Sequence, residues 1–402
     1  RGQEEKLIET SAKAAVLIEK NTGRVLYRCN EETALPMAST TKVMTALLAL
    51  EEGNLDDVVT VSRNAFGVPG TSIYLSEGEK ITLRDLLYGL MLASGNDAAV
   101  AIAEHIGGSV DAFCRRMTER AAELGCQNTV FLSPNGLPTP GHHTTAYDLA
   151  LIAREAMSHP EFREIVSTRR ASIPWEGRSY SRILNNKNRL LADYDGATGI
   201  KTGYTEKAGY CLVSAVQRDG VNVIAVVLGA DGDAASKEFD SFADTVTLLD
   251  WCFENYSYRS IVERGHPAAA QPIEKDGRRG EITLVCSQEI NALAEKALDA
   301  AKLKSEVTLY AETLTDVPAE GTELGTVTFS DPGDGTVYGT VTLVSQGEAR
   351  FEEPEPQTVR PQELSREQKL ATVIVCSIAV FLLLVFILLL VRRSRRMRRK
   401  RR

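Results

Sequence analysis

A serine and a lysine stand three positions apart near the start of an apolar stretch. Ser39 and Lys42 lie within residues 36–50, which are predicted to form the first turns of an apolar helix ending near Gly53. Residues three apart share one face of a helix, so the hydroxyl and the amine can meet. A serine hydroxyl is a weak nucleophile until a base removes its proton, and a buried lysine with a lowered pKa can be that base. The pair suggests acyl transfer, but the spacing alone also fits a capped, solvated helix start.

Two further motifs supply the groups that acyl transfer from a peptide needs. Ser94 and Asn96 fall between two helical runs, and Lys201, Thr202 and Gly203 open a strand-rich region. In this order, S-x-x-K, S-x-N and K-T-G form the signature of penicillin-binding proteins and β-lactamases. Once all three motifs are present, a coincidental serine and lysine at the start of a helix is a poor explanation for the first motif.

The chain resembles the D-alanyl-D-alanine carboxypeptidases, the low-molecular-mass penicillin-binding proteins. The gaps between the motifs, about 50 and then about 105 residues, are similar to those of that family. The resemblance covers residues 10–258 strongly and the next hundred residues loosely. The shared stretches are residues 128–131, 135–137, 142–150, 188–191 and, most specific of all, 199–210.

The resemblance implies a role for each residue of the first two motifs. Ser39 is the expected nucleophile and Lys42 its base. Ser94 would relay the proton to the leaving amine, and Asn96 would hydrogen-bond the substrate amide.

The third motif would hold the end of the substrate. Lys201 and Thr202 would face its terminal carboxylate, and Gly203 would let the peptide lie against the strand as an extra edge. The backbone N–H groups of Ser39 and Tyr204 would form the oxyanion hole.

The implied activity is that of a serine-type D-Ala-D-Ala carboxypeptidase that trims peptidoglycan stem peptides through an acyl-enzyme. The expected partners are a pentapeptide substrate and β-lactam inhibitors, without a metal or any other cofactor. Two alternatives stay open: a β-lactamase or esterase on the same fold, and a catalytically inactive wall-binding scaffold.

Two features depart from the family pattern. Family members often carry an arginine, which helps to grip the carboxylate, just ahead of the last catalytic-domain helix; that place holds Ser241 here, with Lys237 as a nearby substitute. The family also often uses an amphipathic anchor that lies on the membrane. Here the C-terminal segment is expected to span it.

The charge distribution supports a membrane protein and not a nucleic-acid partner. Residues 370–391 form a 22-residue run without a charged side chain, and about 20 apolar residues span a bilayer. Residues 392–402 hold nine of the 46 basic side chains and no acidic one, so the rest of the chain carries 37 basic and 54 acidic side chains, a net charge of −17. The positive-inside rule predicts a cytoplasmic tail and an extracytoplasmic catalytic domain. A signal peptide is expected to have been removed or left out.

Histidines and cysteines give weak signals. His142 and His143 are adjacent on an expected loop, where their side chains diverge, so a metal site is disfavoured. The seven cysteines show no CxxC spacing and are expected to be isolated thiols, with a Cys114–Cys126 disulfide as the alternative.

The elements that must position these residues suggest an α+β fold. Strands near both chain ends of the main domain, with helices between them, predict one antiparallel sheet flanked by helices with an inserted helical lobe, as the resemblance also implies. A small β-rich domain and a transmembrane helix follow. The predicted parts are an N-terminal extension (1–9), a catalytic domain (10–258), a β-rich domain (265–347), a stalk (348–369), a transmembrane helix (370–391) and a basic tail (392–402).

Overall fold

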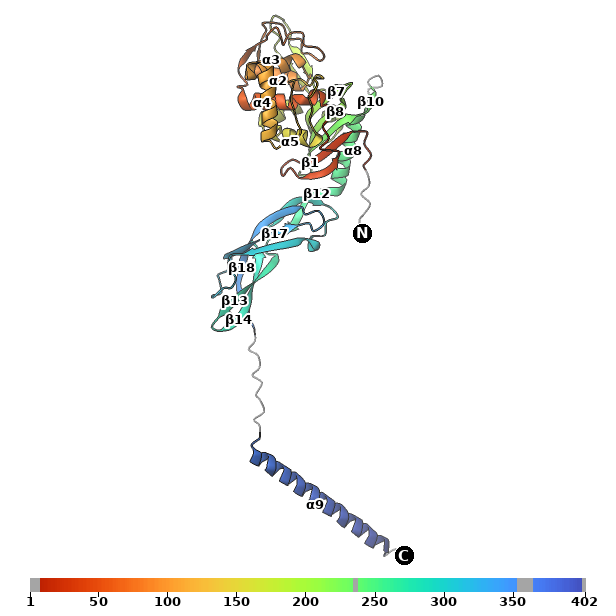
Figure 1. Cartoon of the computed structure of the whole chain (residues 1–402), viewed down its shortest axis with the longest axis vertical. Helices are drawn as coiled ribbons and strands as arrows, with labels where there is room; N and C mark the ends of the chain where they lie inside the picture. Colours follow the sequence, from red (N-terminus) through yellow and green to blue (C-terminus); the bar gives the residue numbers. More distant parts are fainter. Residues whose placement is uncertain (1–7, 234–237, 353–363, 400–402) are drawn as a thin grey trace.

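The computed structural model describes residues 8–233, 238–352 and 364–399 (Figure 1). A mixed helical and stranded part comes first and ends with helix α8 (Asp240–Asn255). A β-rich part follows, from strand β12 (Tyr256–Val262) to the end of β18 (Val337–Phe351). The last element is the long helix α9 (Arg366–Arg399).

The first part is built on one five-stranded antiparallel sheet in the order β2-β1-β9-β8-β7. The sheet joins strands from both ends of this part, which confirms the predicted assembly. Two hairpins form within this sheet: Gly23 has φ +79° in the turn between β1 and β2, and Asp219 and Gly220 have φ +51° and +80°, as the tight turn of a two-residue hairpin requires. The strands are β1 (Ala14–Glu19), β2 (Val25–Cys29), β7 (Ala197–Thr205), β8 (Gly209–Arg218) and β9 (Val221–Ala230).

The sheet is covered on both faces. Successive strand residues point to opposite faces, so Val16 and Ile18 join the core of the helical lobe while Leu17 packs with α8 residues such as Leu249. Seven helices and one short 3-10 helix, η1, lie between β2 and β7 in the sequence. They are η1 (Ala38–Thr41), α1 (Lys42–Glu52), α2 (Leu83–Met91), α3 (Asn96–Gly107), α4 (Val110–Glu123), α5 (Ala146–Ala156), α6 (Pro160–Ser167) and α7 (Leu190–Asp193).

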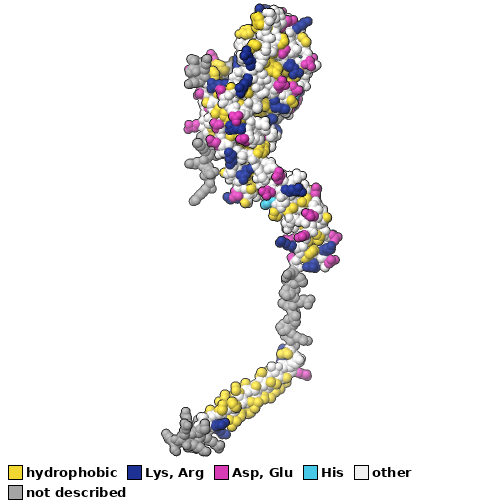
Figure 2. Space-filling view, turned by 180° about the vertical axis from the view of Figure 1, so that it is seen from behind, with side chains coloured by type: hydrophobic (Ala, Val, Ile, Leu, Met, Phe, Trp, Pro, Cys, Tyr) yellow, Lys and Arg dark blue, Asp and Glu magenta, His cyan; other side chains and the backbone are white. Residues whose placement is uncertain are grey.

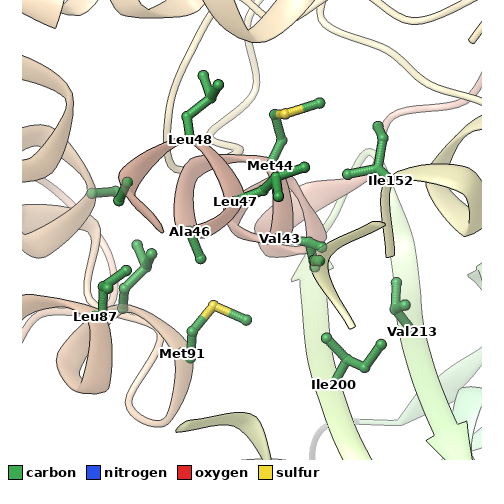
Figure 3. Packing of buried hydrophobic residues seen from close by; sticks show 14 of the residues in the cluster. Val43, Met44, Ala46, Leu47, Leu48, Leu87, Met91, Ile152, Ile200 and Val213 are labelled. Atoms are coloured by element: carbon green, nitrogen blue, oxygen red, sulfur yellow. The ribbon is translucent and has the colours of Figure 1, made fainter. Parts of the chain in front are cut away.

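Helix α1 is buried on nearly all sides and forms the centre of the core. Figure 3 shows Leu47 and Met44 of α1 among side chains from α2, α5 and the sheet, including Met91, Ile152 and Ile200. Each fully buried side chain of this size contributes about 2 kcal/mol through the hydrophobic effect. The packing therefore fixes the N-terminal end of α1, where Ser39 and Lys42 lie.

Short two-stranded sheets accompany the helical lobe and the main sheet. Helices α6 and α7 were not predicted, because each spans only one or two turns. The minor strands are β3 (Val58–Thr60), β4 (Lys80–Thr82), β5 (Arg170–Ile173), β6 (Arg182–Asn185), β10 (Gly232–Asp233) and β11 (Glu238–Phe239).

The β-rich part contains a five-stranded sheet in the order β13-β14-β18-β17-β16 and a separate pair, β12 with β15. Its strands extend beyond the predicted range of 265–347 at both ends. It contacts the first hairpin: Arg24 donates to the Leu293 carbonyl (2.9 Å), and the Tyr258 hydroxyl donates to Glu19 Oε1 (3.0 Å). The remaining elements are β13 (Pro267–Lys275), β14 (Arg278–Cys286), β15 (Ile290–Glu295), η2 (Ala300–Lys302), β16 (Lys304–Leu309) and β17 (Glu323–Ser330).

Helix α9 is long and apolar enough to cross a membrane. Within the candidate span, Arg366–Ser394, the most apolar window has a mean hydropathy of 3.5, and none of that window is buried within the protein. Hydrophobic side chains cover this helix, whereas charged ones are spread over the rest of the molecule (Figure 2). Both ends of the predicted stalk (348–369) belong to regular elements in the structure. Residues 348–351 complete β18 by pairing with β14, and residues 366–369 begin α9. Most of the remaining predicted stalk, residues 353–363, lies outside the described residues.

The cysteines are isolated thiols, as predicted. All seven are free, and Cys114 and Cys126 do not form a disulfide.

Candidate active site

Ser39 and Lys42 meet at the junction of η1 and α1. A 3-10 helix has three residues per turn, so side chains at positions i and i+3 eclipse each other. Lys42 Nζ lies 2.8 Å from Ser39 Oγ. The preceding residue, Ala38, has φ +48°, a conformation that side chains other than glycine rarely adopt, and such strained residues cluster at functional sites.

Lys42 is completely buried, with three oxygen partners. Besides Ser39 Oγ, its amine contacts Asn96 Oδ1 (2.8 Å) and the Asn135 carbonyl (2.6 Å). Burial lowers the pKa of Lys42 well below its usual value, and the charges of Lys201 and Lys187 lower it further. A neutral Lys42 can donate to the two asparagine oxygens while its lone pair accepts the Ser39 proton. This is the arrangement that a general base for Ser39 needs.

The second motif lies in the turn between α2 and α3. Asn96 is buried, and its side-chain amide donates to the Pro69 carbonyl (2.7 Å) while its oxygen accepts from Lys42. Ser94 is also buried and has φ +66°. Its hydroxyl has no hydrogen-bond partner within the described residues, so the expected proton relay is not present as a direct contact with Ser39 or Lys42.

Asp97 holds this turn in place. Its carboxylate accepts hydrogen bonds from the backbone N–H groups of Ile73 (3.1 Å) and Leu75 (3.0 Å) and from the Ser72 hydroxyl (2.6 Å). The loop before α2 and the turn before α3 are thereby tied together beside Asn96.

The third motif lies on β7, the edge strand of the main sheet, which packs against η1. Lys201 is buried and donates to the Thr202 carbonyl (2.9 Å). Burial lowers the pKa of Lys201 to about 7, with a further contribution from the Lys187 charge. Thr202 is half-buried, whereas Tyr204 is exposed, with its ring stacked on Tyr210. An edge strand can accept an extended peptide as an additional strand.

Lys187 is a member of the site that sequence reasoning missed. Lys187 is exposed, and its amine donates to the Thr71 hydroxyl (3.3 Å), while the Thr71 carbonyl accepts from the Asn96 backbone N–H (2.7 Å). Its charge acts on both Lys42 and Lys201. Lys187 adjoins the shared stretch 188–191, but no motif marks it, and only the folded loop brings it to the site.

His142 was also missed, because sequence reasoning considered it only as a metal ligand. Its Nδ1 accepts from the Leu132 backbone N–H (3.0 Å), so Nε2 carries the proton and donates to Thr41 Oγ1 (2.8 Å). Thr41 in turn donates to the Ala38 carbonyl (2.9 Å). Both ring nitrogens are engaged, and burial lowers the His142 pKa to about 4. The neutral imidazole therefore braces the turn that carries Ser39.

One group of side chains has the composition of a metal site, namely Glu51, Glu155 and His159. The Arg120 guanidinium occupies it, with Nη2 at 2.8 Å from a Glu51 oxygen and 3.8 Å from Glu155. This group is an ion-pair network, and a cation bound there would be repelled by the arginine.

Ser241 is the residue expected at the place where family members often carry an arginine. Ser241 lies in the first turn of α8 and is buried. Lys237, the suggested substitute, lies outside the described residues. Within the described part of the chain, Lys201 and Lys187 contribute positive charge near β7.

Comparison with known proteins identifies the family. Residues 2–232 match the peptidase S11 family, described as D-alanyl-D-alanine carboxypeptidase. The chain belongs to the peptidase S11 family.

Relatives and solved structures agree with this family. The chain is 37% identical over 321 residues to the D-alanyl-D-alanine carboxypeptidase DacF of Bacillus subtilis, covering 79% of this chain and 80% of DacF. It is 32% identical to DacD of Escherichia coli, covering 80% and 83%. The crystal structure of penicillin-binding protein 5 from Haemophilus influenzae matches with a TM-score of 0.64 and 27% identity, covering 85% of this chain and 98% of that one.

Membership of the S11 family confirms the predicted fold class and enzyme class. The protein is a serine-type D-Ala-D-Ala carboxypeptidase, a hydrolase with the features of a penicillin-binding protein. The individual residue roles rest on the geometry described above.

Proposed function

We propose that Ser39 forms the acyl-enzyme and that Lys42 is its general base during removal of the terminal D-alanine from peptidoglycan pentapeptides. The contact between a fully buried Lys42 amine and Ser39 Oγ carries this proposal. A lysine in water is protonated at neutral pH, whereas burial and two nearby cations lower the pKa of this one well below its usual value.

Acylation begins when Ser39 Oγ attacks the carbonyl carbon between the two D-alanines, and its proton passes to Lys42. The backbone N–H groups of Ser39 and Tyr204 stabilise the oxyanion, each donor contributing about 3 kcal/mol. The C–N bond then breaks, and the leaving amine takes up a proton through Ser94. Water attacks the ester to release the shortened peptide and restore Ser39.

The substrate would lie along the free edge of β7. Its terminal carboxylate would be recognised by Lys201 and Thr202, with Lys187 adding positive charge in place of the arginine missing at Ser241. The Asn96 amide, already fixed between Lys42 and Pro69, would orient the substrate amide. A β-lactam would acylate the same serine and stall.

The chain would be anchored by residues 370–391, with the catalytic domain (10–258) outside the cytoplasm and the basic tail (392–402) inside it. The hydropathy of α9 and the nine positive charges beyond Val391 support this orientation. In sealed, right-side-out vesicles, external protease should leave the tail intact; cleavage of the tail would contradict this topology.

The decisive assay is D-alanine release from diacetyl-Lys-D-Ala-D-Ala. Wild type should release D-alanine and Ser39→Ala should release none above background. Undiminished release by Ser39→Ala would refute the proposed nucleophile. Rapid turnover of penicillin by wild type, with no D-alanine release, would instead indicate a β-lactamase.

A further inference from the structure

A cavity of about 210 Å³, separate from the candidate active site, opens between α6 and the strands β8 and β9. None of the residues assigned to catalysis lines it. Its apolar surface comes from Met157 and Ala215, and its charged surface includes Lys20 at the end of β1 and Arg163 on α6. We call this space the basic cavity.

Neither cation of the basic cavity forms an ion pair within the described residues, although the charge of the adjacent Glu19 raises the pKa of Lys20. Within the described residues, the Lys20 amine makes neither a hydrogen bond nor an ion pair. Arg163 uses only Nη1, which donates to the carbonyls of Met157 (2.9 Å) and Ser158 (2.7 Å). Its Nε and Nη2 remain available. Burial lowers the pKa of Lys20, and the like charge of Arg163 lowers it further. The two cations therefore repel each other, and an anion bound between them would reduce this repulsion.

Neutral donors complete the lining. The side-chain amides of Gln217 and Asn222 face the basic cavity and have no hydrogen-bond partner among the described residues. One acidic residue, Glu164, also lines it, but Glu164 is exposed and its carboxylate accepts from the Tyr88 hydroxyl (3.2 Å). The lining therefore carries two cations against one carboxylate.

We propose that the basic cavity binds a small oxyanion, a carboxylate or phosphate group, between the Lys20 amine and the free edge of the Arg163 guanidinium. A guanidinium presents its donors in a planar fork that matches two oxygens of such a group. Known ligand pockets span about 300–1,000 Å³, so this smaller cavity suits a metabolite-sized anion or the acidic end of a larger molecule.

The test is isothermal titration calorimetry of the full chain in detergent, with inorganic phosphate and with butyrate as separate probes. Wild type should bind at least one of them, and Lys20→Gln should weaken that binding at least tenfold. The Lys20 side chain has no partner in the fold, so this variant should fold normally. Lys80→Gln, which changes an exposed lysine outside the cavity, is the matched control and should bind as wild type does.

The difference between wild type and Lys20→Gln is the readout, because the active-site lysines also attract anions. Weakened phosphate binding would identify a phosphate site; weakened butyrate binding would identify a carboxylate site that also uses the apolar wall. Equal binding by wild type and Lys20→Gln for both probes, or no binding by wild type, would overturn the proposal.

Discussion

Gly203 of β7 packs directly against the backbone of Ser39. A Cβ added at Gly203 would lie 3.0 Å from the Ser39 nitrogen and 3.1 Å from the Met37 carbonyl oxygen. Real Cβ atoms rarely come so close to backbone atoms, which cannot move aside as a flexible side chain can. The glycine of the third motif thus lets the edge strand approach the turn that carries Ser39.

Gly203→Ala should therefore separate β7 from η1 by a few tenths of an ångström and misplace the proposed oxyanion donors. We expect kcat/KM for D-alanine release to fall by about 10–100-fold, since small displacements of reacting groups cost up to about 100-fold. Gly333→Ala, in a turn of the β-rich part, should leave the rate unchanged. A Gly203→Ala enzyme with the wild-type rate would show that this contact does not position the site.

Lys187→Met should move the acidic limb of the pH–rate profile to higher pH. The base must be neutral, and removing the Lys187 charge raises the pKa of Lys42, so a higher pH is needed to deprotonate it. The same change should raise KM, because one cation near the carboxylate site is lost. Lys187→Arg keeps the charge and should keep the wild-type limb; an unshifted limb in Lys187→Met would argue against electrostatic coupling to Lys42.

Lys201→Ala should discriminate between substrates that differ only in their terminal charge. A hydrogen bond to a charged group contributes about 1.5–3 kcal/mol, so kcat/KM should drop about 10–100-fold more for a peptide with a free terminal carboxylate than for its C-terminal amide. The comparison uses both peptides with wild type and variant. Equal losses on the two peptides would mean that Lys201 does not recognise the carboxylate.

His142 should make the catalytic domain less stable in acid. Its pKa is lowered to about 4 in the folded protein, against about 6.5 when unfolded, so the unfolded chain binds more protons between these values. Stability is full above about pH 6.5 and declines as the pH falls toward 4, by up to about 3 kcal/mol. Calorimetric unfolding should show this decline in wild type and in His143→Gln, and a smaller one in His142→Gln. The same pH dependence in all three proteins would assign the decline to other groups.

Much of the fold follows from local patterns in the sequence. The hairpin turns at Gly23 and Gly220 and the capping of α2, where the Thr82 hydroxyl accepts from the Asp85 N–H, depend only on neighbouring residues, so local patterns can indicate them. The end of β18 depends instead on pairing with β14, which lies about 70 residues earlier in the chain, and short-range periodicity does not reveal it.

The candidate site also contains contacts that local spacing predicts and contacts that it does not. Helical spacing predicts the Ser39–Lys42 contact. The expectation that the three motifs meet in one site depended on the resemblance to the family. Lys187 and His142 act through contacts with Thr71 and Thr41, residues more than 100 positions away. Such contacts form only when distant loops fold together, so single-sequence reasoning has no signal for them.

Mass spectrometry of the protein treated with benzylpenicillin tests the central claim most directly. Wild type should gain one penicilloyl group per chain, on the peptide that contains Ser39, and Ser39→Ala should gain none. Ser181→Ala serves as the matched control, because it removes an exposed serine hydroxyl outside the three motifs, and it should still be labelled at Ser39. Labelling of Ser39→Ala to the wild-type extent, or a label on another residue in wild type, would contradict the account.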